Sequence, residues 1–179
     1  MDYYKEVIIP NWDEVQQYCK SKWDGKFVSA KTFTGTELQY LGTLLEPTIQ
    51  QQTGITAKIK TAIMFINEPW FKQGMHIDGF TLNRANASDT ALNLPILNCD
   101  TAPMMWYSGD FYLTSSQGDT IKYLKINWTS EHNVAATKII NRPTIVKINV
   151  PHHIENHSDA PRLMLSIRFT PDLRMENFQ

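Results

Sequence analysis

The chain has 179 residues, of which 42% are hydrophobic and 20% charged, and its formal net charge is −1. This is the composition of a soluble globular protein of one domain with a substantial core. There is no basic run or tail that would favour nucleic acid, no apolar stretch of the roughly 20 residues that cross a membrane, and no start typical of a secretory signal, so we expect a cytoplasmic protein.

The first part of the chain is predicted to be mainly helical. A short amphipathic helix is expected over Asn11–Cys19, with its first residue as the cap, because the aromatic and apolar residues recur at helical spacing. A strand at Lys26–Phe33 follows. A second helix is expected to start at a cap on Thr36, to end before Gly54, and to break or kink at Pro47.

From residue 55 onward, the pattern of apolar residues changes from helical to extended. Many short strands without intervening helices favour an antiparallel sandwich or small barrel over a βαβ fold. We therefore expect one domain over residues 1–179, with a helical outer layer at 1–54 and a β core at 55–170. The candidate strands, separated by turn-forming residues, are Ile55–Asn67, His76–Phe80, Ala91–Asn98, Met104–Tyr107, Asp110–Thr114, Thr120–Trp128, Thr144–Val150 and Arg162–Thr170.

A candidate metal-ligand set stands out in these strands. His76 and Asp78 are two residues apart, so on a strand both side chains point to the same side and can reach one ion. A second histidine, His152, comes from a distant segment that the fold can bring alongside. Two imidazoles and one carboxylate on one face of an octahedral metal leave three positions open, which is the ligand set of a non-haem Fe(II) oxygenase.

The choice of the second histidine has alternatives, since His153 and His157 lie close to His152. His153 is offset by one residue and points to the other face of an extended segment. His157 lies in a predicted turn, where the direction of a side chain is poorly fixed. The spacing to Arg162 and the following Ile154 favour His152, and His157 ranks ahead of His153. A solvated polar loop or an adventitious zinc site is the alternative reading of all three.

The alternation of residues along the last strand predicts a polar pocket. Leu163, Leu165, Ile167 and Phe169 would share one face of this strand, and the opposite face would carry Arg162, Met164, Ser166 and Arg168. We therefore expect helices outside the sheet and a pocket inside it. By the same parity Asn93 is a candidate pocket residue, although a satisfied core amide is an equal alternative.

The sequence resembles the iron- and 2-oxoglutarate-dependent dioxygenase superfamily, and most nearly its small prolyl-hydroxylase-like and aspartyl/asparaginyl-β-hydroxylase-like branches. The resemblance covers approximately Ile55–Thr170. The segments that carry it are Met75–Gly79, Ala91–Ile96, Val150–Asn156 and Ala160–Phe169. The pair His76-x-Asp78 is weak alone, whereas His152-x-Ile154 with Arg162 ten residues later is more specific.

This resemblance implies a fold, a site and a reaction. The fold would be mainly β, a double-stranded β-helix of the jelly-roll, cupin-like type with the N-terminal helices packed outside one sheet. Fe(II) would be held by His76, Asp78 and His152, and the far carboxylate of 2-oxoglutarate by Arg162. Asp78 departs from the aspartyl/asparaginyl branch, which usually lacks this carboxylate, and its presence counts against the superfamily's halogenases.

The implied reaction consumes 2-oxoglutarate and O₂, releases succinate and CO₂, and hydroxylates an amino-acid side chain, peptidyl or free, or a small metabolite. Asn93, Ser166 and Arg168 are further candidates for the co-substrate site, with Arg168 a second partner for its carboxylate. Aromatic residues Trp70, Trp106 and Tyr107 are candidates for the pocket wall or for core packing, and the connection Thr129–Pro143 for a substrate lid or a variable loop. The alternative function is a non-enzymatic or cupin-like jelly roll that binds a metal, a carbohydrate or a protein partner.

Overall fold

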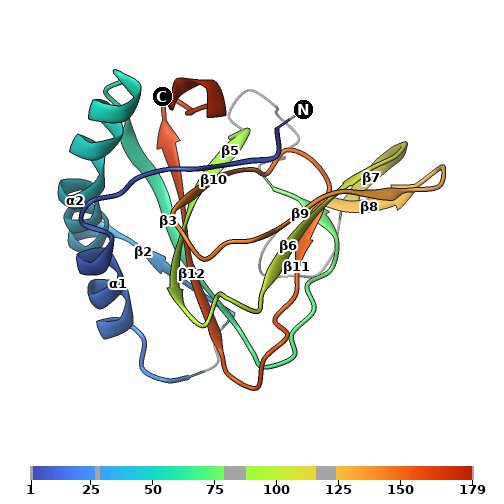
Figure 1. Cartoon of the computed structure of the whole chain (residues 1–179), viewed down its shortest axis with the longest axis horizontal. Helices are drawn as coiled ribbons and strands as arrows, with labels where there is room; N and C mark the ends of the chain where they lie inside the picture. The colour runs from blue at the N-terminus through green and yellow to red at the C-terminus, as the bar shows by residue number, and fades with distance from the viewer. Residues whose placement is uncertain (1, 27–28, 79–87, 116–123, 179) are drawn as a thin grey trace.

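The predicted fold class is confirmed. A computed structural model describes residues 2–26, 29–78, 88–115 and 124–178. Its strands form two six-stranded antiparallel sheets, and two helices lie outside one of them, which is a jelly-roll, cupin-like arrangement (Figure 1).

The sheet next to the helices, called the major sheet here, has the order β1-β10-β5-β12-β3-β2. Two of its strands come from the first 54 residues: β2 lies within the strand predicted at Lys26–Phe33, whereas β1 was not predicted. β1 has only three residues, too few to show a periodicity, and it forms by pairing with β10. The strands are β1 (Tyr4–Glu6), β10 (Thr144–Lys147), β5 (Thr90–Leu97), β12 (Arg162–Thr170), β3 (Lys58–Asn67) and β2 (Ala30–Phe33).

The minor sheet has the order β7-β8-β4-β11-β6-β9, and its β7–β8 hairpin extends away from the helices (Figure 1). Its strands are β7 (Phe111–Ser115), β8 (Leu124–Trp128), β4 (His76–Ile77), β11 (His152–Ile154), β6 (Pro103–Ser108) and β9 (Asn133–Ile139). The predicted strands at 76–80 and 120–128 continue into residues 79–80 and 120–123, which lie outside the described residues.

The segment Thr129–Pro143 is not the long loop or lid that the sequence suggested. Most of it is β9, which pairs with β6 along its length. β9 is an edge strand with most of its residues exposed, and it carries few large apolar side chains. Its sequence therefore lacks the alternation of apolar residues by which a strand is recognised. The strand forms because it pairs with β6.

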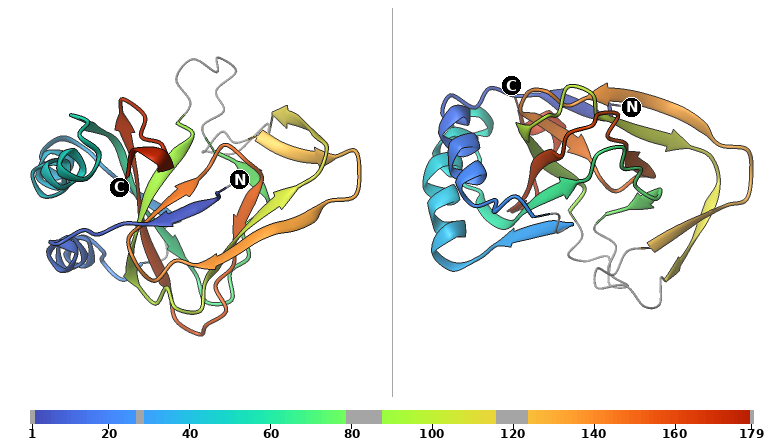
Figure 2. Two further views of the ribbon diagram at one scale, coloured as in Figure 1. Left: turned by 45° about the horizontal axis from the view of Figure 1, so that its top comes forward. Right: turned by 90° about the horizontal axis from the view of Figure 1, so that it is seen from below.

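The helices α1 (Trp12–Ser21) and α2 (Gly35–Thr53) cover the outer face of the major sheet (Figure 2). The end of α2 is as predicted, because Gly54 adopts the left-handed conformation with φ 70°. Its start differs, since the cap position is Thr34 and not Thr36. Asn11 does occupy the cap position of α1, but its side chain donates to Leu44 O at 2.6 Å and so ties α1 to α2.

The predicted break at Pro47 is absent, since α2 runs through this residue. A proline inside a helix costs about 3 kcal/mol. On either side of it, Leu45 and Ile49 are fully buried against the sheet, and burying each such side chain contributes roughly 1.5–3 kcal/mol. Packing of the buried face therefore offsets the lost helical hydrogen bond.

The main core lies between the helices and the major sheet. The outward face of β12 supplies Leu163, Leu165, Ile167 and Phe169 to it, as the alternation predicted. No helix in the described part of the chain has the length and apolarity needed to cross a bilayer.

Leu165 offers a test of this core, because it is fully buried on β12, an interior strand of the major sheet. Leu165→Ala should lower the free energy of unfolding by about 2–5 kcal/mol, since a cavity is left behind. Urea denaturation measures this change. The control Val134→Ala, at an edge-strand residue that is 54% exposed, should shift it by less than about 0.5 kcal/mol.

Candidate metal centre and pocket

Three sequence-predicted ligands meet on the inner face of the minor sheet. His76 opens β4, His152 opens β11, and the two strands pair with these residues directly opposite each other. Their ring centroids are 4.5 Å apart, and His76 Nε2 lies 3.3 Å from Asp78 Oδ1. One ligand atom of each residue lies within 4.8 Å of the others, and among the described residues this is the group able to hold a metal ion.

Both histidines are held by the same local contact. His76 Nδ1 lies 2.9 Å from Gly74 O, and His152 Nδ1 lies 2.8 Å from Val150 O. A carbonyl oxygen only accepts hydrogen bonds, so each Nδ1 carries the proton and donates it. His152 Nε2 then presents its lone pair, as a metal ligand requires, and His76 Nε2 does so once the proton it donates to Asp78 Oδ1 is lost. In both residues the carbonyl fixes the orientation of the ring.

The electrostatics of the group suit a cation. Burial lowers the pKa of His152 to about 4, so this imidazole is neutral near pH 7. Burial alone would raise the pKa of Asp78, but its hydrogen bond with His76 and the neighbouring positive charges hold that pKa well below its usual range. Burial also acts to lower the pKa of His76, yet the contact with Asp78 outweighs it and the net pKa is raised. The metal-free pair His76–Asp78 therefore retains a proton into a higher pH range than a free imidazole.

Metal binding should consequently depend on pH through one proton. Below the raised pKa of His76 a metal must displace that proton, so the apparent Kd for Co(II) should rise about tenfold for each pH unit of acidification. Above that pKa the affinity should be constant. Titrations with Co(II) between about pH 5 and pH 8 measure the slope. A slope of two protons would mean that His152 also titrates there, against its lowered pKa.

A small pocket lies beside these ligands, between the two sheets. Its volume is about 30 Å³, which is room for one or two waters. Larger ligands therefore require side chains to move, and Met104 and Met164, which are unbranched and flexible, line the wall. The lining consists of the three ligands with Phe65, Asn67, Gln73, Asn93, Met104, Ile148, Ile154, Met164 and Ser166.

The inner face of β12 forms one side of this pocket. Ser166 and Met164 line it, and Asn93 pairs with Ser166 from the neighbouring strand β5. Asn93 is thus a pocket residue, and its Oδ1 is buried without a hydrogen-bond partner among the described residues. Along β12 the order is Arg168 nearest the metal ligands, then Ser166, Met164 and finally Arg162.

Arg162 is fully buried at the far end of this row. Its Nη1 donates to Asn67 Oδ1 at 2.6 Å, whereas Nε and Nη2 have no oxygen or nitrogen partner among the described residues. Within that part of the chain no carboxylate pairs with the guanidinium; the Cys99 thiol interacts with it, but burial has the larger effect and lowers the pKa of Arg162. An arginine in a protein stays charged, so this cation lacks a counter-ion beside a pocket whose wall includes Asn67.

Arg168 is placed differently from the role considered for it in co-substrate binding. Its Nη2 lies 2.7 Å from Asp78 Oδ2, so it pairs with a metal-ligand residue. It is therefore a largely buried ion pair and not a surface one, and its candidate role in co-substrate binding stays a prediction.

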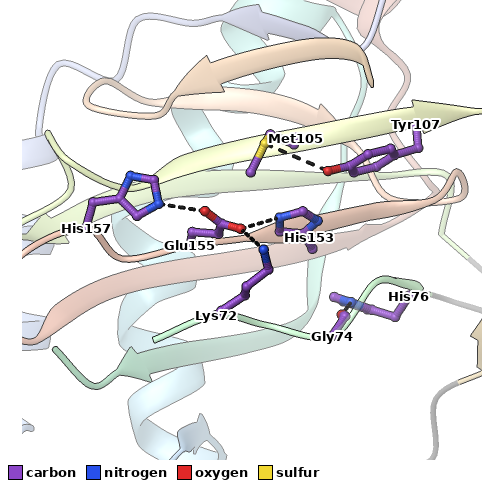
Figure 3. A network of polar contacts seen from close by, with 8 residues as sticks. All are labelled: Lys72, Gly74, His76, Met105, Tyr107, His153, Glu155 and His157. Carbon is purple, nitrogen blue, oxygen red and sulfur yellow. Dashed lines mark hydrogen bonds and ion pairs between the residues drawn. The ribbon is translucent and has the colours of Figure 1, made fainter. Parts of the chain in front are cut away.

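The remaining histidines of the segment turn to the outer face of the minor sheet (Figure 3). His153 Nε2 lies 3.1 Å from Glu155 Oε1, and His157 Nε2 lies 2.6 Å from Oε2. Lys72 contacts the same carboxylate at 2.7 Å, and hydrogen bonds, first from Lys72 and then from His157, lower the pKa of Glu155 to about 2. This network joins the segment before β4 to β11, behind the two ligand histidines.

None of the three aromatic residues considered for a pocket wall lines the pocket. Trp106 is fully buried in the core beneath β6 and donates to Lys147 O at 2.8 Å. Tyr107 is on the outer face, stacked on His153 with a centroid distance of 5.4 Å. Trp70 is 70% exposed. Strand parity separates Trp106 from Tyr107, and a loop position gave no direction for Trp70.

Two pocket residues, Asn67 and Gln73, were not predicted from the sequence. Asn67 ends β3 directly opposite Arg162. Gln73 lies in the segment before β4, and its Oε1 is buried without a partner among the described residues. The pairing register that brings Asn67 to Arg162 is not readable from one strand alone.

Comparisons with known proteins bear on the fold. No protein-family model matches the chain, and no curated protein matches its sequence. Among solved structures it is similar to SnoK, a "non-heme alpha ketoglutarate dependent carbocyclase" from nogalamycin biosynthesis, with a TM-score of 0.55 and 11% identity over 93% of this chain and 78% of that one. A weaker similarity, to the Drosophila melanogaster CENP-C cupin domain, has a TM-score of 0.29 and 8% identity over 59% of this chain and 58% of that one.

The likeness to SnoK shows a shared fold. Fold and site together define a jelly-roll protein with a candidate His-Asp-His metal centre.

Proposed function

We propose that this protein is an Fe(II)- and 2-oxoglutarate-dependent oxygenase. The observation that carries the proposal is the proximity of two features. A complete group of two imidazoles and a carboxylate lines the pocket, and beside the pocket, in contact with its wall residue Asn67, lies a buried arginine whose Nε and Nη2 have no oxygen or nitrogen partner among the described residues. A metal-binding jelly roll without 2-oxoglutarate chemistry needs the first feature and not the second.

The donor set fits iron. His76, Asp78 and His152 can supply two neutral nitrogens and one anionic oxygen, and the Nδ1–carbonyl contacts of both histidines leave Nε2 as the ligating atom. Such a set occupies three of the six octahedral positions. The donors also suit Co(II) and Mn(II), which serve as probes in place of iron.

The far end of the pocket fits a second carboxylate. A buried guanidinium without a counter-ion is costly, and a carboxylate ligand that accepts from Nε and Nη2 removes that cost with two parallel hydrogen bonds. Residues along one face of a strand are spaced about 6.6 Å apart. Ser166 and Asn93 line the pocket between the levels of Arg168 and Arg162, and the long side chain of Arg162 must reach back toward the metal ligands for one co-substrate to contact both.

In this proposal the residues of the chain bind and orient the metal and the co-substrate. When bound, iron and 2-oxoglutarate supply the oxidation of substrate, with succinate and CO₂ as co-products. Arg162 binds the far carboxylate of the co-substrate, and Asn93 and Ser166 contact it from the pocket wall. The apolar lining, including Phe65 and Ile148, keeps bulk water from the centre.

The substrate class is proposed on the sequence resemblance to the prolyl-hydroxylase-like branch. It is an amino-acid side chain, peptidyl or free, or a small metabolite, which the protein hydroxylates in the cytoplasm. SnoK is described as a carbocyclase, so related folds support other outcomes than hydroxylation. Succinate, which is formed whatever the fate of the substrate, is therefore the product to assay first.

The test begins without oxygen. Addition of Fe(II) and 2-oxoglutarate to the purified protein should give the weak visible charge-transfer band of their chelate. Admission of O₂ should then give succinate, first without a substrate and faster with a member of a panel of prolyl peptides and free amino acids. Absence of the band together with absence of 2-oxoglutarate binding by calorimetry would favour a non-enzymatic jelly roll.

A further inference from the structure

The two oxygens of Asp78 face different partners. Oδ1 lies 3.3 Å from His76 Nε2, on the side of the metal ligands. Oδ2 lies 2.7 Å from Nη2 of Arg168. The carboxylate is thus divided between the candidate metal position and a guanidinium from the opposite sheet.

The contact is built into the fold. Arg168 and Asp78 have side chains only 14% and 24% exposed, so their charge-assisted hydrogen bond is shielded from water. The pairing of β12 with β3 is irregular between Arg168 and Phe169. Such a bulge re-aims the neighbouring side chain and is frequent beside active sites. On the other edge of β12, the pairing with β5 has its last partners at Ile167 and Leu92.

A carboxylate can bind a metal through one oxygen or through both. With two histidines and one oxygen of Asp78, three of six positions stay open. With both oxygens bound only two stay open, and a bidentate keto acid fills these. No position then remains for O₂. The number of Asp78 oxygens on the metal therefore decides whether the complex can react.

We propose that Arg168 is a positioning residue that restricts Asp78 to one metal-bound oxygen and so keeps one coordination position open. This inference rests on the proposed function for its consequence in turnover, but not for its effect on coordination. To bind through both oxygens, Asp78 must turn Oδ2 away from Arg168. The lost charge-assisted hydrogen bond opposes that rotation.

The experiment counts water molecules on the metal. Mn(II) is bound to wild-type protein and to Arg168→Met, and the paramagnetic relaxation of water protons is measured. The variant should show a relaxivity lower by roughly one third, as three exchangeable waters become two. With 2-oxoglutarate added, the count should fall from one water in wild type to none in the variant. Substrate-free succinate formation should fall about 10- to 100-fold, while the Kd for 2-oxoglutarate changes far less.

Companion variants separate positioning from a general loss of structure. Arg168→Lys keeps a cation that can pair with Oδ2 and should restore most of the wild-type water count. Arg168→Gln has a neutral donor and should fall between Lys and Met. Arg174→Met, at an exposed arginine paired with Glu176, should match wild type in every measurement. If Arg168→Met does not fold, the water counts of Arg168→Gln and Arg168→Lys are compared instead, and a lower count in Arg168→Gln supports the inference.

Two results would overturn the inference. An unchanged water count in Arg168→Met would show that Asp78 binds through one oxygen without help. Loss of Mn(II) binding to the extent seen in Asp78→Ala would show that Arg168 is needed to hold Asp78 in place at all. If wild type binds Mn(II) but not 2-oxoglutarate, the proposed function fails, and the metal-only water count still decides the role of Arg168.

Discussion

Arg162→Met should bind Fe(II) like the wild type and require far more 2-oxoglutarate. Arg162 is fully buried, and its Nε and Nη2 have no oxygen or nitrogen partner among the described residues. In the complex these groups would face the far carboxylate of the co-substrate. Loss of one partner of a desolvated charge pair costs about 2–5 kcal/mol, which raises the Kd roughly thirty- to several-thousand-fold. Calorimetry with the metal-loaded protein measures the Kd for 2-oxoglutarate.

The stability of this variant separates binding from folding. A buried guanidinium without a counter-ion destabilises the ligand-free protein, and an apolar residue of similar volume is often neutral or stabilising there. The melting temperature of Arg162→Met without ligand should therefore equal or exceed that of wild type. Arg162→Lys should recover only part of the affinity, because one ammonium cannot reproduce the planar fork.

Pyruvate provides the matched control, since it is a keto acid without the far carboxylate. Its affinity for the metal-loaded protein should be the same in Arg162→Met as in wild type. If 2-oxoglutarate also binds Arg162→Met as well as wild type, Arg162 is not its partner. The buried cation would then need another anion, and the co-substrate assignment would fail with it.

The fold was predictable where burial leaves a pattern in the sequence. The alternation of Leu163, Leu165, Ile167 and Phe169 against Arg162 and its neighbours gave both the strand and the faces of β12. Where burial leaves no pattern, the prediction failed. Most residues of the edge strand β9 are exposed and none is fully buried, and the tertiary packing of Leu45 and Ile49 overrode the local preference of Pro47.

The site was predictable to the extent that its members share a strand. His76 and Asp78 are two residues apart, parity puts His152 and His153 on opposite faces, and the spacing to Arg162 favoured His152. Contacts between strands were not predictable. Asn67 meets Arg162 through the register of β3 and β12, and Arg168 meets Asp78 across the two sheets. Both contacts depend on the assembled fold, which is why the sequence predicted neither Asn67 as the partner of Arg162 nor Asp78 as the partner of Arg168.

Removal of any one ligand should abolish turnover. His76→Ala, Asp78→Ala and His152→Ala each take one of three protein donors from the metal. Affinity for Co(II) should fall by more than the about 10- to 100-fold that changes in supporting residues cost. Succinate formation should fall to background. Titration with Co(II) and a succinate assay measure the two effects.

His153→Ala is the matched control, because it removes a histidine from the same strand and leaves the metal-facing side intact. His153 Nε2 contacts Glu155 on the outer face, so this variant should keep Co(II) affinity and turnover. Asp78→Asn adds a second comparison, since its amide oxygen can still accept from Arg168 while the anionic ligand is lost. It should fold like wild type and bind Co(II) weakly, which assigns the loss to the carboxylate's charge and not to a broken pair. If His153→Ala loses the metal as completely as His152→Ala, the wrong face of β11 has been assigned and the metal centre lies elsewhere.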